Sequence, residues 1–223
     1  MEYLNKDSGK KLILKRKKSM PLYFFNKRLF DILVSLIALI ILSPIFFIVW
    51  VLNIINVSDR GPLFYRQIRI GINGKKFGMY KFRSMVVNAE EKLHQNKKLY
   101  KEYVSNNYKL KPEDDPRITK LGKFLRKSSI DEIPQFINII KGDMSLVGPR
   151  PVIEEELKEY DKNKLLSVKP GAMGLWQASG RSKIGYPQRA YIEMSYIDNA
   201  CFTMDLKIIL GNIKNIINGK GAY

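Results

Sequence analysis

The stretch ILVSLIALIILSPIFFIVWVL, residues 32–52, contains no charged side chain. It is long enough to cross the hydrocarbon core of a bilayer as a helix, which takes about 20 residues. Pro44 lies near its middle, where proline removes a backbone donor and clashes with the preceding turn. The Ser43 hydroxyl is placed to bond backbone groups that such a break releases. The sequence therefore predicts a membrane segment, residues 21–56, broken at Ser43-Pro44.

Basic residues flank this segment on both sides. Lys27 and Arg28 precede it, Arg60 and Lys75 follow it, and lysine and arginine mark the cytoplasmic side of a membrane. Since neither flank is suited to translocation, we expect a re-entrant helix that leaves the bilayer on the side it entered. A kinked spanning helix is the alternative. In the re-entrant arrangement Lys27 and Arg28 are expected to contact lipid phosphates at the interface.

The composition of the chain restricts its partners. With 223 residues and a formal charge of +18, it suits one compact domain plus an anchor, and it favours an anionic partner. A single cysteine, Cys201, suits a reducing compartment, and a single histidine, His94, excludes a histidine-rich metal site and disfavours a Ser-His-Asp triad. No helix-turn-helix, zinc-finger or aromatic RNA-binding pattern is present. We therefore expect a lipid surface or a phosphorylated substrate, and no nucleic acid.

The pattern along the chain predicts an α+β fold that is mostly helical. We divide the chain into a basic irregular arm at 1–20, the membrane segment at 21–56 and a small cytoplasmic domain at 57–223 with amphipathic surface helices. Within 63–85, β-prone residues around Asn73-Gly74 predict a short hairpin. Helices are expected at 88–110, 118–127, 134–141, 154–166 and 186–218, and glycine-rich loops at 142–151 and 169–182.

The most specific local signal is SSIDEIPQ, residues 128–135. Pro134 marks a helix start, so Asp131 and Glu132 lie at the end with free N–H groups and partial positive charge. With basic residues nearby, this setting suits a diphosphate: cations neutralise its oxygens while a carboxylate attacks phosphorus or holds a metal. Mg²⁺, a hard cation, is the metal that suits these oxygen ligands. The alternative is an ordinary helix start in which Ser129 and Glu132 form a capping box.

Beyond the basic arm, residues 25–219 carry an ordered set of motifs that resembles the bacterial sugar transferase family, the monotopic polyprenyl-phosphate phosphoglycosyl transferases. These motifs are Lys27-Arg28-Leu29-Phe30-Asp31, Ser43-Pro44, Gly61-Pro62-Leu63-Phe64-Tyr65-Arg66-Gln67, Arg69-Ile70-Gly71, Phe77, Tyr80-Lys81-Phe82-Arg83-Ser84-Met85, Asp115-Pro116-Arg117-Ile118-Thr119, Asp131-Glu132, residues 142–151, Lys169-Pro170-Gly171 and residues 174–181.

The resemblance implies a catalytic cytoplasmic domain and a ping-pong reaction. Asp131 would attack the β-phosphorus of a UDP-sugar, release UMP and carry the phosphosugar until polyprenyl phosphate takes it. Glu132 would assist by positioning Mg²⁺ or the acceptor phosphate, so both acids are the candidate metal ligands. This is the first membrane step of surface glycan synthesis, such as capsule, O-antigen or exopolysaccharide. The resemblance also implies the re-entrant helix broken at Ser43-Pro44, located in the inner membrane with the catalytic domain on the cytoplasmic face.

Further residues match basic or polar positions of the family. Lys81, Arg83, Arg126 and Arg150 are the candidates for phosphate contacts, with structural ion pairing as the alternative. In the second glycine-rich loop, Trp176, Gln177 and Arg181 are the candidates for binding the nucleotide sugar, and a Trp176 that is buried at an interface is the alternative.

Several questions stay open at the level of sequence. The chain resembles the short, catalytic-only form of the family, and its loop at 174–181 resembles that of relatives that transfer galactose or glucose phosphate. Expected partners are a UDP-sugar, polyprenyl phosphate and inner-membrane lipids, while the sugar, the pathway and the oligomeric state, with a homodimer as one option, are open. The alternative function is a membrane-tethered basic binding or scaffold protein of a glycan-synthesis complex without catalysis, against which the intact Asp131-Glu132 pair argues.

Overall fold

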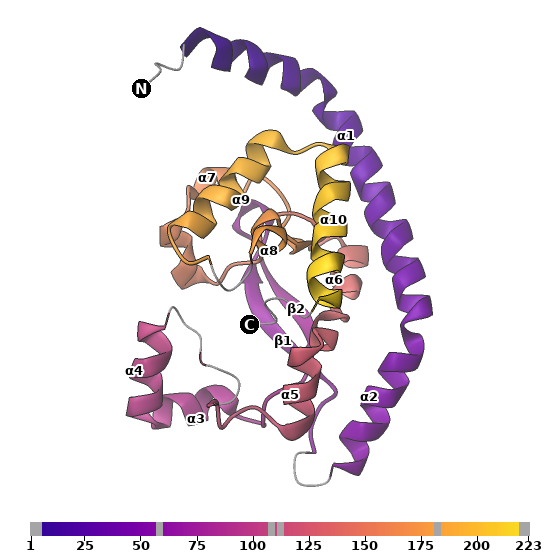
Figure 1. Ribbon diagram of the computed structural model, residues 1–223, viewed down its shortest axis with the longest axis vertical. Coiled ribbons are helices and arrows are strands. Elements are labelled where there is room, and N and C mark those ends of the chain that lie inside the picture. Colours follow the sequence, from indigo (N-terminus) through magenta and orange to yellow (C-terminus); the bar gives the residue numbers. More distant parts are fainter. Residues whose placement is uncertain (1–5, 57–59, 107–109, 111–113, 181–183, 219–223) are drawn as a thin grey trace.

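The computed structural model describes residues 6–56, 60–106, 110, 114–180 and 184–218, without the side chains of residues 6–20 and 217. Its longest element, α1 (Lys6–Ile41), runs along one edge of the whole molecule (Figure 1). The irregular arm predicted at 1–20 is therefore wrong from Lys6 onward. Residues 10–20 contain neither glycine nor proline and are rich in lysine and leucine, which are good helix formers.

The predicted break at Ser43-Pro44 is confirmed. A second helix, α2 (Ser43–Ile55), follows α1 directly, and the two are bent by 53° at Leu42. Ser43 Oγ donates to the carbonyl of Ile40 at 2.8 Å, so the hydroxyl takes up a carbonyl at the break as expected. Among the described residues no single helix has the length and hydropathy of a membrane span, whereas 21–41 and 43–55 reach them together as one bent pair.

The outer surface of this bent pair is apolar. Large aliphatic and aromatic side chains are exposed along both helices, and these include Phe25, Leu29, Leu33, Ile37, Ile40, Ile41, Phe47, Ile48 and Ile55. On the opposite side Asp31 and Ser35 are buried, and Asp31 Oδ1 accepts a hydrogen bond from the Leu146 amide at 3.0 Å. The pair therefore packs on the rest of the protein through one face and leaves a continuous apolar face uncovered.

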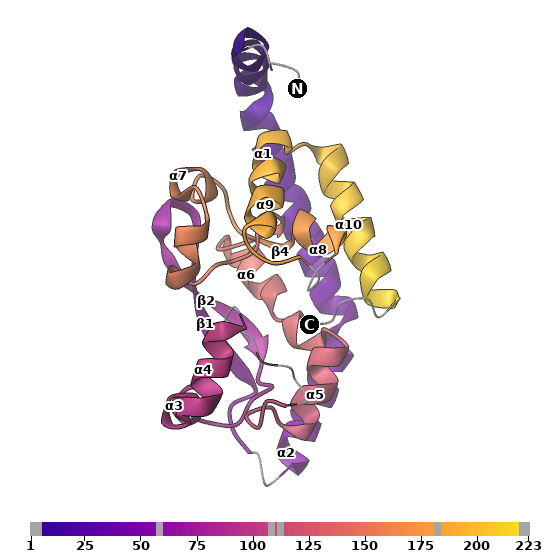
Figure 2. The ribbon, with the colours of Figure 1, turned by 60° about the vertical axis from the view of Figure 1, so that its left-hand side comes forward.

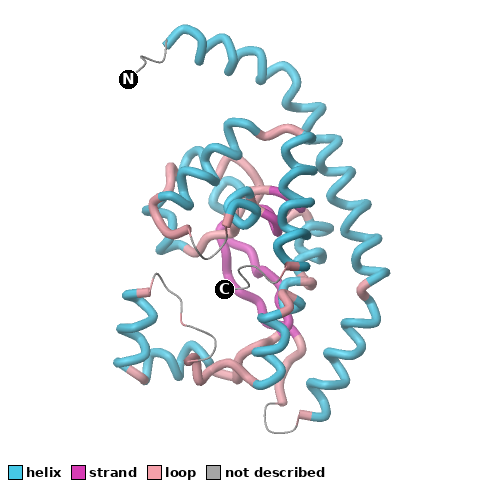
Figure 3. The backbone as a smooth tube through the Cα atoms, in the orientation of Figure 1, coloured by secondary structure: helices cyan, strands magenta, loops and turns pink. Residues whose placement is uncertain are grey.

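The predicted hairpin is confirmed. Strands β1 (Phe64–Ile70) and β2 (Lys76–Phe82) pair antiparallel, with Phe64 opposite Phe82 and Ile70 opposite Lys76. The connection contains the short 3₁₀ helix η2 (Ile72–Gly74), in which Asn73 and Gly74 have φ of 56° and 77°. Asparagine and glycine tolerate this left-handed conformation, which is why the pair closes a tight turn. The hairpin lies at the centre of the molecule (Figure 3).

A second, parallel pair of strands was not predicted. Strand β3 (Ser145–Val147) lies in the first glycine-rich segment and β4 (Gly171–Met173) in the second, so neither segment is only a loop. Their backbones approach closely: a Cβ on Gly171 would lie 2.0 Å from the Gly148 nitrogen. Glycine is required here because no side chain fits between the two strands.

The helices differ from expectation mainly where they are interrupted. The helix expected at 88–110 is two helices that meet at Asn96, whose side chain accepts from the Leu99 amide, and the helix expected at 186–218 is interrupted at Ala200-Cys201. In place of one helix at 154–166 there are two short ones, while the helix after Pro134 ends at Gly142 as predicted. The bounds are α3 (Ala89–Gln95), α4 (Lys97–Ser105), α5 (Lys120–Lys127), η3 (Ile130–Glu132), α6 (Gln135–Lys141), η4 (Glu154–Glu159), α7 (Lys162–Leu165), α8 (Leu175–Ser179), α9 (Gln188–Asn199) and α10 (Phe202–Ile217).

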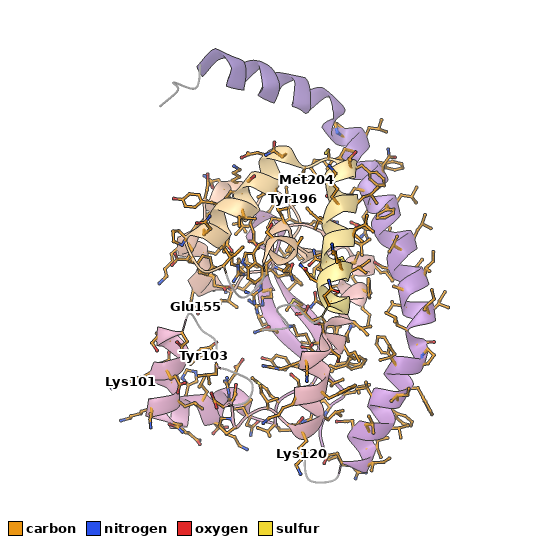
Figure 4. The ribbon with its side chains drawn as sticks, viewed as in Figure 1. Lys101, Tyr103, Lys120, Glu155, Tyr196 and Met204 are labelled. Carbon is orange, nitrogen blue, oxygen red and sulfur yellow. The ribbon has the colours of Figure 1, made fainter. Side chains whose placement is uncertain are left out.

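The core joins the bent helix pair to the other elements. The largest cluster connects β2, α6, β3, α9 and α10, with Tyr196 and Met204 between α9 and α10 (Figure 4) and Phe30 and Val34 of α1 against it. In a separate cluster, Val49 of α2 packs with Phe82 and Leu125. Helix α10 lies beside α1 in both views (Figures 1 and 2), where Lys27 pairs with the buried Asp205 at 2.7 Å.

Candidate active site

The two predicted acids occupy the short 3₁₀ helix η3, between α5 and α6. Ser129 adopts a left-handed conformation with φ of 57° and turns the chain out of α5. Its side chain makes no capping bond, so the capping-box alternative is wrong. The side chain of Asp131 is 9% exposed and that of Glu132 is 43% exposed. The two neighbouring carboxylates therefore occupy different environments, one enclosed and one open to solvent.

Lys81 of β2 faces both acids. Its Nζ lies 2.9 Å from Glu132 Oε1 and 3.9 Å from Asp131 Oδ2. The position of Lys81 relative to the acids is fixed by Asn138 of α6, which is fully buried. Its Oδ1 accepts from the Tyr80 amide at 2.8 Å, and its Nδ2 donates to the Gly78 carbonyl at 2.9 Å. The side-chain amide thus completes the backbone bonding of β2 and holds α6 and the acids against this strand.

The charge on Asp131 reflects this setting. Burial raises the pKa of the Asp131 carboxyl to about 6, Lys81 and Arg126 act in the opposite direction, and Glu132 adds to the rise. The carboxylate is thus ionised at neutral pH while poorly hydrated. A weakly hydrated carboxylate next to cations is suited to attack phosphorus or to bind a cation.

Arg126 lies beside the acids. Its Nε donates to Ser84 Oγ at 2.9 Å, which ties α5 to the loop after β2. Gly122 lets α5 approach this loop, because a Cβ there would lie 1.9 Å from the Ser84 carbonyl oxygen. The structure therefore brings Lys81, Arg126 and the two acids together.

Arg150 lies in the first glycine-rich segment and interacts electrostatically with Glu132, one of the two acids. Its Nη1 lies 3.7 Å from Glu156 Oε1, and its guanidinium lies 6.0 Å from the centre of the Trp176 ring. Burial opposes the charge on Arg150, but Glu156, Glu193 and also Glu132 outweigh it and raise its pKa. Arg150 is thus a cation within electrostatic reach of Glu132.

Arg83 makes hydrogen bonds within the protein, and its expected phosphate contact stays a prediction. Its Nε donates to the Pro62 carbonyl at 2.9 Å, its Nη1 to the Met85 carbonyl at 3.0 Å and its Nη2 to Asn53 Oδ1 at 2.8 Å. The guanidinium therefore fastens the end of α2 to the hairpin.

The second glycine-rich segment also differs from expectation. Trp176 is buried and its Nε1 donates to the Ile184 carbonyl at 3.0 Å, so the alternative of a buried tryptophan is confirmed. Gln177 Oε1 accepts from the Gly174 amide, so this side chain closes the first turn of its own helix α8. Arg181 lies outside the described residues.

The two basic residues expected at the lipid interface bond within the protein. Lys27 Nζ pairs with Asp205 Oδ2, and Arg28 donates to the carbonyls of Ile139 and Ile140 at 2.5 and 2.7 Å. Both carbonyls belong to the last turn of α6, whose partial negative charge favours a cation. Lys27 thus docks α1 on α10, and Arg28 docks it on α6, the helix that follows the acids. Contact of these residues with lipid phosphates stays a prediction.

The candidate metal ligands are few. In the part of the chain that the structure describes, no group of three or more histidine, cysteine or acidic residues is close enough to hold an ion. Mg²⁺ commonly binds through one or two carboxylates together with substrate phosphates and water. The pair Asp131 and Glu132 fits that mode, in which the substrate completes the ligand set.

Sequence reasoning missed a group of buried charges behind Arg150. Arg69, Glu156, Arg189 and Glu193 are all buried, and Glu193 is 0% exposed. The signal that was available is helical spacing, because Arg189, Glu193 and Tyr196 lie on one buried face of α9. Without the fold, nothing distinguished that face from a solvated one.

An enclosed carboxylate, an open one and several cations beside an apolar helix pair define a site suited to phosphoryl transfer. Comparison with known proteins agrees. A family model described as bacterial sugar transferase matches residues 22–219. The chain belongs to the bacterial sugar transferase family.

The relatives differ in length, and this chain covers a different share of each. An undecaprenyl-phosphate galactose phosphotransferase of Salmonella typhimurium is 43% identical over 204 residues, which cover 89% of this chain and 42% of the relative. The exopolysaccharide production protein ExoY of Sinorhizobium fredii is 41% identical over 91% of this chain and 90% of its own length. A UDP-N-acetylgalactosamine-undecaprenyl-phosphate N-acetylgalactosaminephosphotransferase of Aeromonas hydrophila is 35% identical, over 91% of this chain and 46% of the relative. The chain thus spans less than half of two relatives and nearly all of the third.

Proposed function

We propose that the protein transfers a sugar 1-phosphate from a UDP-sugar to polyprenyl phosphate, and so starts the assembly of a surface glycan. The observation that carries the proposal is the enclosed Asp131 carboxylate, held beside Lys81 and next to the open Glu132 carboxylate. The names of the Salmonella and Aeromonas relatives support this reaction, and that of ExoY supports an exopolysaccharide as the product of the pathway.

The reaction proceeds in two displacements. An Asp131 carboxylate oxygen attacks the β-phosphorus of the UDP-sugar, and the bond from that phosphorus to the oxygen of the α-phosphate breaks, which releases UMP. An oxygen of polyprenyl phosphate then attacks the same phosphorus, and the acyl phosphate bond to Asp131 breaks. The products are polyprenyl-diphosphate-sugar and the free carboxylate. Splitting one displacement in two lets a single phosphoryl site serve donor and acceptor in turn.

The remaining residues of the site stabilise charge. Lys81, Arg126 and Arg150 provide cations for the phosphate oxygens, and such preorganised charge is a large part of catalysis of phosphoryl transfer. Asp131 and Glu132 would hold Mg²⁺ together with the diphosphate, and the ion supplies further charge neutralisation when bound. Glu132 is exposed enough to contact either the ion or the incoming acceptor phosphate.

The reaction can be tested with purified protein in nanodiscs and a panel of UDP-sugars. We expect Mg²⁺-dependent release of UMP and transfer of sugar label into the lipid extract when polyprenyl phosphate is present. A chelator is expected to stop both. If no UDP-sugar in the panel yields UMP, while the protein binds membranes or DNA without turnover, the binding-protein alternative is favoured.

We also propose that the bent helix pair is re-entrant and anchors the protein in the cytoplasmic leaflet of the inner membrane. Its uncovered apolar face supports this, as does α10, where Leu206, Leu210 and Ile213 are exposed on one side. Lysines 120, 123 and 127 surround the exposed Phe124 on α5, which suits an anionic headgroup layer. The bilayer would cover all three surfaces.

Single cysteines test this topology. In a Cys201→Ser background, because Cys201 is exposed, Lys18→Cys and Lys75→Cys are expected to react with an impermeant maleimide in inside-out vesicles only. Both positions flank the bent pair, so a spanning arrangement predicts that one of them reacts only from the opposite side. Labelling after detergent solubilisation provides the control for reactivity.

A further inference from the structure

Arg150 belongs to a cluster of charges whose other members are buried and have no role in the proposed reaction. We call it the arginine–glutamate cluster; its members are the half-buried Arg150 and the buried Arg69, Arg189, Glu156 and Glu193. Arg69 Nη1 lies 3.5 Å from Glu156 Oε2, and the Arg189 guanidinium lies 4.2 Å from the centre of the Trp176 ring. Burial of so many charges is costly unless each is paired, so the cluster calls for an explanation beyond packing.

The two carboxylates of the cluster accept hydrogen bonds from backbone amides at the two ends of residues 150–153. Glu193 Oε1 accepts a hydrogen bond from the Arg150 amide at 3.2 Å, and Glu156 Oε2 accepts one from the Ile153 amide at 3.1 Å. Residues 150–153 are an extended segment in which Val152 pairs with Ile70 of β1. Glu193 of α9 therefore holds the start of this segment, and Glu156 holds its end, where Ile153 caps η4. Hydrogen bonds from backbone amides to carboxylates are charge-assisted and are stronger than neutral ones.

Two tyrosines orient these carboxylates in turn. The Tyr160 hydroxyl donates to Glu193 Oε2 at 2.9 Å, and the Tyr186 hydroxyl donates to Glu156 Oε1 at 3.3 Å. With both its oxygens engaged, the fully buried Glu193 is confined to one orientation. It makes its bond to the backbone of residue 150, whereas the guanidinium of that residue lies 3.7 Å from Glu156 Oε1 and interacts electrostatically with Glu132.

We infer that Glu193 is a positioning residue for Arg150: it fixes the backbone from which the guanidinium reaches the phosphate site. This inference rests on the proposed function, because it assigns Arg150 to the donor phosphates. In this role Glu193 does not itself contact the substrate and acts only through the backbone of residues 150–153. Without the Glu193 carboxylate the Arg150 amide loses this acceptor. The backbone that carries the guanidinium is then no longer held in one position.

A double-mutant cycle tests this inference. The variants are Glu193→Gln, Arg150→Lys and the two combined, measured by steady-state release of UMP. We expect Glu193→Gln to raise KM for the UDP-sugar about tenfold, because the charge-assisted bond to the Arg150 amide becomes a weaker, neutral one, with kcat changed less than about threefold. In the Arg150→Lys background the same change is expected to raise KM less than about twofold, because the group that Glu193 positions is already altered. Effects that multiply in the double variant overturn the inference.

Matched variants separate positioning from folding. Asp205→Asn removes another buried carboxylate, one that accepts hydrogen bonds from Tyr23, Lys27 and Tyr196 and from none of residues 150–153. It is expected to lower the unfolding temperature with KM unchanged, and an equal rise in KM would overturn the inference. If Glu193→Gln does not fold, Tyr160→Phe replaces it, and its expected effect is a smaller rise in KM that again vanishes with Arg150→Lys.

A second measurement does not depend on turnover. Hydrogen exchange of the peptide that contains residues 148–153 is expected to be faster in Glu193→Gln than in the unchanged protein, with Asp205→Asn as the control. Faster exchange without any UMP release by the unchanged protein leaves the positioning intact and refutes the proposed function. Unchanged exchange in Glu193→Gln, with UMP release intact in the unchanged protein, refutes the positioning role and leaves the function.

Discussion

Replacing Asp131 with asparagine is expected to lower the rate of UMP release from a UDP-sugar by about a thousandfold or more, because the nucleophile of the first displacement is lost. The variant keeps the size of the side chain, which is enclosed and faces Lys81. With donor labelled in the sugar, the unchanged protein is expected to carry label covalently when polyprenyl phosphate is absent, and Asp131→Asn to carry none. Mass spectrometry of the labelled peptide then locates the adduct.

Two controls give this experiment its meaning. Glu132→Gln alters the open carboxylate and is expected to slow release while the adduct on Asp131 still forms. Since burial raises the pKa of Asp131 to about 6, its ionised form costs folding free energy at neutral pH. Asp131→Asn is therefore expected to unfold no more easily than the unchanged protein, so its loss of activity cannot come from misfolding. Rapid UMP release by Asp131→Asn would refute the nucleophile assignment.

The parts of the fold that the sequence predicted correctly depend on local patterns. Pro44 ends the preceding helix because proline lacks a backbone donor and clashes with the preceding turn, and Asn73-Gly74 readily adopts the left-handed conformations of a tight turn. The parallel strands β3 and β4 were missed because the paired residues 145 and 171 are far apart in the sequence, so no local pattern marks their pairing. Three-residue strands carry too little alternation to be detected.

The site was predicted unevenly for a related reason. Asp131, Glu132 and Lys81 meet as expected, since their chemistry is carried by ordered motifs. Arg83 and Trp176 belong to equally specific motifs, yet the structure gives them partners from distant elements, Asn53 of α2 and the Ile184 carbonyl. A motif shows that a residue is needed, whereas its partner shows whether that need is chemical or structural. The arginine–glutamate cluster could not be predicted from the sequence because its pairs join separate elements.

Replacing Asp115 with asparagine is expected to reduce the free energy of unfolding by about 3–5 kcal/mol, since it leaves a buried cation without its partner. Asp115 and Arg117 are 3% and 6% exposed, and two of their bonds, from Arg117 Nε and Nη2, are 2.8 and 2.7 Å long. The Arg117 carbonyl accepts from the Val86 amide at 2.8 Å, so the pair fastens the start of α5 to the loop after β2. Denaturant unfolding in detergent measures the loss.

The pH dependence distinguishes this buried pair from a surface one. Burial alone acts to raise the pKa of Asp115, but the hydrogen bonds and charge of Arg117 outweigh it and hold the pKa below the ordinary value of about 4. The folded state thus binds this proton less strongly than the unfolded state, so the contribution of Asp115 is fully present above about pH 4 and is lost as the pH falls through its lowered pKa. The difference in stability between the unchanged protein and Asp115→Asn is therefore expected to be constant near neutral pH and to shrink in acid.

Glu154→Gln breaks a pair with Lys76 whose side chains are 66% and 60% exposed, and it is expected to leave stability unchanged within error at every pH. A difference for Asp115→Asn that is equally small near neutral pH would mean that water reaches Arg117 and that the start of α5 is held by other contacts.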